Sequence, residues 1–170
     1  ARHDGEMAAV AEAVAQHYQP KGPGDAVPEG PVAVSVALAD KLDQIVAFFG
    51  VGEKPTGSGD PFALRRAALG VIRIIRERGL RLELRPLLRL ARNQAPSPCD
   101  VDEVLGFLLE RLRVQLRAEG ARHDVLNAVL GAGQDDDLVR LLARADAVAA
   151  LLGTGDVANL LAAYKRAANI

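Results

Sequence analysis

The residue types best suited to chemistry in this sequence are the arginines near its middle. Residues 61–92 carry nine arginines, no lysine and only two glutamates, although the whole chain has a net charge of −1. The guanidinium group is planar and can donate two parallel hydrogen bonds to one phosphate. This concentration of arginine therefore favours a surface that contacts a phosphodiester backbone, as nucleic-acid-binding proteins do.

The spacing of four of these arginines places them on one side of a helix. At about 100° per residue, Arg65, Arg66, Arg73 and Arg76 fall within about a quarter-turn of one another. The adjoining face is apolar and can be buried, since it carries Leu64, Ala68, Val71, Ile72 and Ile75. This spacing is compatible with guanidinium groups that face a phosphodiester backbone. The alternative is a solvated face whose arginines pair with the acidic segments on either side.

A glycine-rich loop over residues 50–60 precedes this helix and carries Lys54. It lacks the G-x-x-x-x-G-K-[ST] order of a P-loop, and no strand-like pattern leads into it. Backbone N–H groups beside a helix N-terminus, together with Lys54, could still contact a phosphate. Lys54 is therefore a candidate for phosphate contact, and the alternative is a long turn that lets two helices pack.

Metal and nucleophile chemistry have weaker support in this sequence. His3, Asp4, His17 and Asp40 are residue types that bind divalent cations in metal-dependent HD phosphohydrolases, but their spacing is poor. The single cysteine, Cys99, lies in a proline-containing linker with no obvious base beside it, and it excludes an internal disulfide. We predict no catalytic residue and no metal ligand in this chain.

The apolar pattern predicts an all-α fold. Hydrophobic residues make up 49% of the chain but aromatic residues only 4%, and no strand-like alternation persists. No apolar run approaches the roughly 20 residues of a membrane span, so no membrane partner is expected. We expect helices over residues 4–18, 32–49, 60–79, a shorter stretch ending near 92, 101–119, 123–130, 136–152 and 156–168.

Glycine and proline mark several of the expected helix ends. Gly50 is placed as the C-terminal cap of the second helix, and Asp60–Pro61 as the N-cap and first residue of the third. The chain begins without methionine and stops at Ile170, directly after an amphipathic pattern. These ends favour a segment of a longer protein.

The most distinctive string is ALADKLDQIVAFFGVGEKPTGSGDPFALRRAALGVIRII, residues 37–75. It resembles the segment characteristic of the β subunit of bacterial heterotetrameric glycyl-tRNA synthetase. The sequences before and after it follow the family's order, so that the resemblance covers nearly the whole chain. One departure is Gly59, where a basic residue is expected before Asp-Pro-Phe.

The resemblance implies a part of glycine–tRNA ligase that lacks the catalytic centre. The α subunit of an α2β2 assembly would hold that centre and use ATP and Mg²⁺, whereas this chain would contact glycine-specific tRNA in the cytoplasm. Residues 1–60 would be the end of an HD-like helical domain, 61–95 a basic helical connector, and 96–170 an α-helical anticodon-binding domain of the DALR type.

The residues and the resemblance together predict the tRNA contacts. Besides Lys54 and the four arginines above, the second half of the chain would present Arg113, Arg117, Tyr164, Lys165 and Arg166. Two alternatives stay open. One is a metal-dependent HD phosphohydrolase fragment, and the other is a helical assembly module in which apolar surfaces such as Phe48 and Phe49 dock a partner without RNA binding.

Overall fold

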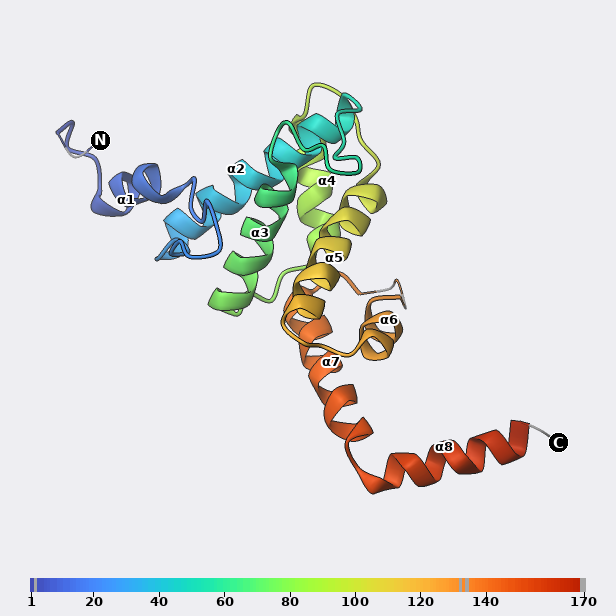
Figure 1. The fold of residues 1–170 in the computed structure, drawn as a ribbon. Coiled ribbons are helices and arrows are strands. Elements are labelled where there is room, and N and C mark those ends of the chain that lie inside the picture. Colours follow the sequence, from blue (N-terminus) through green and yellow to red (C-terminus); the bar gives the residue numbers. More distant parts are fainter. Residues whose placement is uncertain (2, 132, 134, 169–170) are drawn as a thin grey trace.

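The computed structural model describes residues 1, 3–131, 133 and 135–168. Within these residues the fold has eight helices and no strand, apart from an isolated bridge between Thr56 and Gly59 (Figure 1). The predicted all-α class is confirmed. The helices are α1 (Ala8–Gln16), α2 (Pro31–Gly50), α3 (Leu64–Arg78), α4 (Leu84–Gln94), α5 (Val101–Ala118), α6 (His123–Gly131), α7 (Leu138–Leu152) and α8 (Gly155–Ala168).

Helices α2, α3, α4 and α5 pack together and enclose the core. Each contributes apolar side chains that are almost completely buried, for example Ile45, Ile72, Leu88 and Leu108. One continuous cluster of buried residues extends from Val27 to Leu141 and so crosses the predicted boundaries at residues 60 and 95. The division into three parts stays a prediction.

The remaining helices lie around this core. Helix α1 packs on α2, α6 packs on α5 and α7, and α7 also contacts α3. Among the described helices α8 contacts α7 alone, and Figure 1 shows it projecting away from the bundle as an arm. Most of the described side chains of α8 are exposed, whereas more than half of the residues of α3 are buried.

The start of α3 differs from the prediction. Asp60 and Pro61 form a turn, and the helix begins at Leu64 after Ala63, whose φ is 54°. The reason lies in tertiary packing, since Phe62 stacks on Phe48 with ring centroids 4.1 Å apart. Asp60 still caps the helix, because its carboxylate accepts hydrogen bonds from the backbone N–H groups of Leu64 and Arg65 at 2.8 and 3.0 Å.

Gly50 is the last residue of α2 and does not cap it in a left-handed conformation. That conformation belongs to Gly52, with a φ of 81°. Gly50 instead lies against the linker between α4 and α5, where a Cβ at this position would overlap the carbonyl oxygen of Ser97. Glycine is thus required at position 50 by the close approach of two backbones.

We predict that Gly50→Ala destabilises the fold by about 1–3 kcal/mol, because the linker must shift to admit the methyl group. Gly106→Ala is the matched control, since Gly106 also lies in a helix but has open space around its Cα. This control should stabilise the fold by about 0.5–1 kcal/mol through helix propensity. Urea unfolding of the two variants tests the prediction, and equal effects would contradict it.

Two of the three aspartates before α7 connect it to the start of α4. Asp137 accepts a hydrogen bond of 2.6 Å from Nε of Arg81, and Asp136 accepts one of 2.7 Å from the backbone N–H of Arg85. Asp135 lies beside them with a side chain that is 8% exposed. The acidic run is therefore a structural joint between the two helices.

Asp135 is held in its ionised form by two arginines of α7. Arg140 donates two hydrogen bonds of 2.6 and 2.7 Å to its carboxylate, and Arg144 donates one of 3.0 Å. The hydrogen bonds from Arg140 are the main cause that lowers the pKa of Asp135 below its ordinary value. A carboxylate with a lowered folded-state pKa stabilises the fold above its ordinary pKa and loses this effect as the pH falls through the folded value.

We therefore predict that Asp135→Asn lowers the free energy of unfolding by about 1–3 kcal/mol at pH 7. The difference from the natural protein should shrink between about pH 5 and pH 2, as Asp135 becomes protonated. Urea unfolding over a pH series measures this. Asp146→Asn, on an exposed position of α7, removes the same charge and serves as control. A pH-independent difference at Asp135 would exclude this role.

Candidate nucleic-acid interface

Arg73, on the flank of α3, is engaged within the fold. Its guanidinium donates to the carbonyl oxygens of Gly22 and Asp25 at 2.8 and 2.9 Å, and to the carboxylate of Glu77 at 2.9 Å. Its side chain is only 18% exposed. Arg73 therefore fastens the loop between α1 and α2 onto α3.

Arg76 pairs with a different part of the fold. It donates two hydrogen bonds of 2.9 Å to the two carboxylate oxygens of Glu119, the residue that follows α5. This fork-to-fork geometry is the strong form of an arginine–carboxylate pair. Their hydrogen bonds are the main cause that raises the pKa of Arg76 and lowers that of Glu119.

Arg73 and Arg76 are therefore not free within the fold, and their contact with RNA phosphates stays a prediction. The alternative, in which arginines pair with acidic segments, is confirmed for Arg76. Arg65 is half-buried and donates to the carbonyl oxygen of Gly57 at 2.7 Å. Arg66 alone of the four is exposed and makes neither a hydrogen bond nor an ion pair with any described residue.

Lys54 is also paired. Its ammonium group lies 2.7 Å from both carboxylate oxygens of Glu103 on α5 and 5.7 Å from the ring centroid of Phe49. This ion pair holds the glycine-rich loop against α5. Because Gly59 also lacks a basic side chain, no cation in this loop is left unpaired among the described residues.

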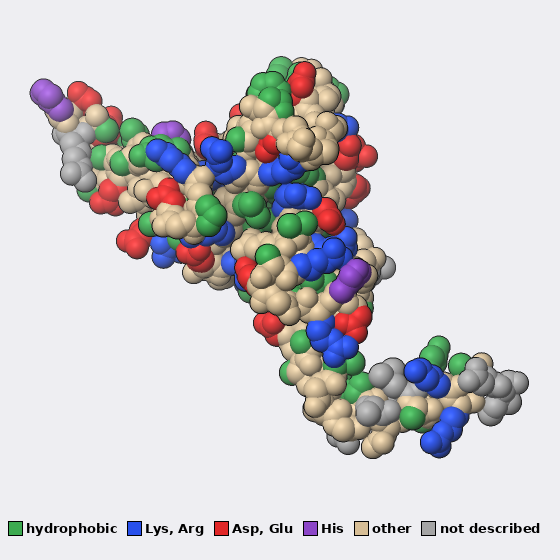
Figure 2. Space-filling view, viewed as in Figure 1, with side chains coloured by type: hydrophobic (Ala, Val, Ile, Leu, Met, Phe, Trp, Pro, Cys, Tyr) green, Lys and Arg blue, Asp and Glu red, His purple; other side chains and the backbone are tan. Residues whose placement is uncertain are grey.

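The predicted residues of the second half fall into two groups. Arg113 is half-buried and donates to Glu110 at 2.8 Å, and Arg117 is exposed with a contact of 3.1 Å to the Nε2 atom of His123. The other group is Tyr164, Lys165 and Arg166, all exposed on α8. Figure 2 shows Lys and Arg side chains toward the outer end of this arm.

Sequence reasoning missed the buried cation Lys41. It lies on α2, is only 4% exposed, and donates a hydrogen bond of 3.1 Å to the carbonyl oxygen of His17. The helical pattern gave no signal that this lysine turns inward. Such a signal would have required knowing that Gly70 of α3 lies opposite.

Comparison with known proteins identifies the family. A family model described as glycyl-tRNA synthetase beta subunit matches residues 1–131. The chain belongs to this family. Proteins named glycine–tRNA ligase beta subunit are 57% identical over 164 residues in Rhodospirillum centenum, 56% over 161 in Phenylobacterium zucineum and 50% over 177 in Cereibacter sphaeroides.

These alignments cover 95%, 95% and 100% of the chain, but 23%, 22% and 25% of the respective relatives. The chain therefore spans about a quarter of the length of the glycine–tRNA ligase β subunits that it matches.

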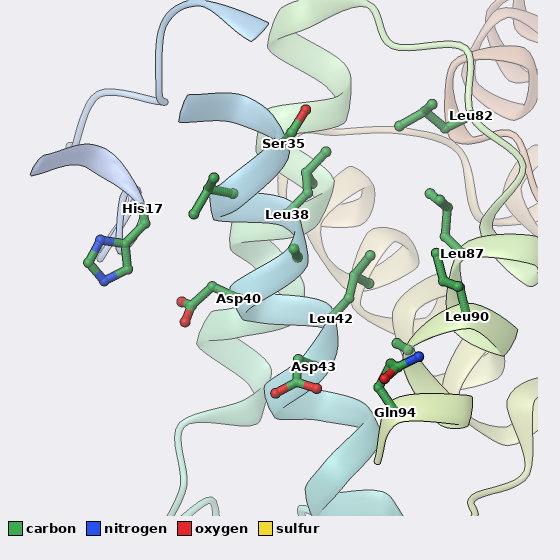
Figure 3. Close-up of a pocket in the computed structure, with 13 residues that line it drawn as sticks. His17, Ser35, Leu38, Asp40, Leu42, Asp43, Leu82, Leu87, Leu90 and Gln94 are labelled. Carbon is green, nitrogen blue, oxygen red and sulfur yellow. The ribbon is translucent and has the colours of Figure 1, made fainter. Parts of the chain in front are cut away.

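The HD phosphohydrolase alternative is not favoured in this member of the β subunit family. No group of three or more His, Cys, Asp or Glu side chains in the described residues is arranged to hold a metal ion. His17 has its Nδ1 atom 2.9 Å from the carbonyl oxygen of Val14, as expected for a histidine at a helix end. Figure 3 shows His17, Asp40 and Asp43 beside a groove of about 650 Å³ whose far wall is lined by leucines of α4.

Phe48 and Phe49 do not offer a docking surface, contrary to the assembly-module alternative. Phe49 is buried against Phe107, with ring centroids 5.3 Å apart, and Phe48 is half-buried under Phe62.

Membrane insertion is a separate question. Within the described ranges, every helix is too short or too polar to cross a bilayer.

We predict that Arg73→Ala lowers the free energy of unfolding by about 1–3 kcal/mol, because it leaves carbonyl groups of the α1–α2 loop without their donor. Arg66→Ala is the matched control on the same helix and should change stability by less than about 0.5 kcal/mol. Urea unfolding compares the two. Equal stability of both variants would show that Arg73 does not hold the loop.

Proposed function

We propose that this chain is a tRNA-binding part of the β subunit of glycyl-tRNA synthetase. In the complete enzyme it would support the ATP-dependent attachment of glycine to glycine-specific tRNA. The observation that carries this proposal is the family match over residues 1–131, together with relatives named glycine–tRNA ligase beta subunit that are 50–57% identical.

The proposal assigns no reacting group to this chain. Glycine activation, which uses ATP and Mg²⁺, is placed in the α subunit of a cytoplasmic α2β2 assembly. The described residues contain no cluster of acidic, histidine or cysteine side chains suited to a metal ion, so none of them is assigned to Mg²⁺. This chain then acts by binding and orienting tRNA.

The basic residues differ in how readily they can meet RNA. A phosphate that approaches Lys54, Arg73 or Arg76 must first displace a carboxylate or carbonyl partner at 2.7–2.9 Å. Lys165 and Arg166 are exposed and make no ion pair with any described residue. We therefore place the first contacts on α8 and on Arg66, while Arg65, Arg113 and Arg117 stay secondary predictions.

Helix α8 combines the two kinds of contact that RNA recognition needs. Lys165 and Arg166 can hold backbone phosphates, which position the RNA without reading its sequence. Tyr164 has a side chain that is 69% exposed and can stack on an unpaired base, as in the recognition of single-stranded loops. An arm that carries both is suited to the anticodon loop.

We predict that Lys165→Ala/Arg166→Ala in the complete synthetase weakens tRNA binding. If each side chain contacts one phosphate, the slope of log affinity against log salt should fall by about 1.4 to 1.8. A filter-binding titration with glycine-specific tRNA at several salt concentrations measures this slope.

Two controls separate RNA binding from general damage. Glycine-dependent ATP–pyrophosphate exchange should be unchanged, because activation is assigned to the α subunit. Arg89→Ala, at an exposed position of α4, should leave the salt slope as it is. An unchanged slope in the α8 variant would refute this placement of the tRNA.

A further inference from the structure

A second cavity lies between α2, α3 and the segment that follows α1. Its volume is about 220 Å³, several times the roughly 30 Å³ that one water molecule takes up in the liquid. Three cations line it, each from a different element: Lys21, Lys41 and Arg66. We call this cavity the α2–α3 pocket.

Lys41 is built into the wall of this pocket. A Cβ on Gly70 would lie 2.8 Å from Cε and 3.0 Å from Cδ of Lys41, so the lysine stem packs closely against the backbone of α3 at Gly70. The side chain of Lys41 is thus fixed between α2 and α3, with its ammonium group near the end of α1. Its position is set by core packing, unlike that of an ordinary surface lysine.

The ammonium group of Lys41 has unmet hydrogen-bonding capacity. It carries three N–H donors, and its hydrogen bond to the carbonyl oxygen of His17 uses one. Within the described residues it forms no ion pair, and burial lowers its pKa, although Asp40 acts in the opposite direction. Burying a cation without a counter-charge is unfavourable, so an anion beside Lys41 would stabilise it.

The other groups of the pocket also leave positive charge available. Arg66 is exposed and has no described partner, and the ammonium group of Lys21 lies 4.1 Å from the ring centroid of Tyr18. Asp40 is the one acidic residue that lines the described pocket, and it is exposed. The net charge of the lining is therefore positive.

We infer that the α2–α3 pocket binds one phosphate group, with Lys41 and Arg66 as its ligands. Arg66 supplies a planar pair of donors, and Lys41 supplies a fixed point charge. This inference rests on the proposed function for the source of the phosphate, which is then the backbone of the bound tRNA. A free phosphate or a small phosphorylated ligand would use the same chemistry.

The test measures how fast phenylglyoxal, a reagent for arginine side chains, modifies Arg66 in the complete synthetase. Mass spectrometry gives the modification rate of each arginine with sodium phosphate and with sodium chloride at equal ionic strength. At a phosphate concentration about twice the dissociation constant, the rate at Arg66 should fall about threefold. The rate at Arg89, exposed on α4 outside the pocket, should not change.

Two variants test whether protection of Arg66 depends on the pocket and whether Arg66 contacts RNA. Lys41→Met keeps the aliphatic stem but removes the charge, and it should abolish protection of Arg66 by phosphate. Arg66→Gln should lower the salt slope of tRNA binding by about 0.7 to 0.9, whereas Arg89→Gln should not. If Lys41→Met fails to fold, two measurements still test the inference. They are the protection of Arg66 by phosphate in the natural enzyme and the salt slope of tRNA binding in Arg66→Gln.

Each outcome has a distinct meaning. Selective protection of Arg66 by phosphate together with a lower slope in Arg66→Gln supports a tRNA phosphate in the pocket. Protection with an unchanged slope supports the pocket and overturns tRNA as the source. If phosphate does not protect Arg66, the pocket is overturned, and the proposed function survives provided that the α8 variant still weakens tRNA binding.

Discussion

The fold depends on how α3 is held at the centre of the molecule. This helix buries Ala68, Val71, Ile72 and Ile75 almost completely, so its arginines lie at the border between core and surface. A guanidinium group in that position needs acceptors, since a desolvated charge without them is strongly unfavourable. The α1–α2 loop supplies backbone carbonyls to Arg73, and Glu119 supplies a carboxylate to Arg76.

The same constraint explains the uneven distribution of charge along the sequence. The excess of arginine in residues 61–92 meets the acids of other segments, as in the contacts of Arg81 with Asp137 and of Arg85 with Asp102. On the face shown in Figure 2, both basic and acidic side chains lie on the bundle surface. Most of the arginines in residues 61–92 therefore stabilise the packing of helices and loops.

The sequence was sufficient to predict the helices, because their apolar periodicity is strong and glycine or proline separates them. It did not predict the start of α3, since the left-handed conformation of Ala63 follows from the stacking of Phe62 on Phe48. The partners of Arg73 also could not be predicted from the sequence. They are backbone carbonyls about fifty positions earlier in the chain, which carry no side-chain signal. Burial of Lys41 likewise depends on a glycine of another helix.

The pairing of cations also limits where a polyanion can bind with a gain in free energy. When a phosphate replaces Glu119 at Arg76, one strong charge-assisted contact is exchanged for another, and the released carboxylate must be solvated or repelled by the RNA. At Arg66, and at Lys165 and Arg166, a phosphate need not displace any hydrogen-bond or ion-pair partner among the described residues. Binding should therefore concentrate at the margins of the bundle, where α2 and α3 leave a cationic pocket and α8 extends away from the core.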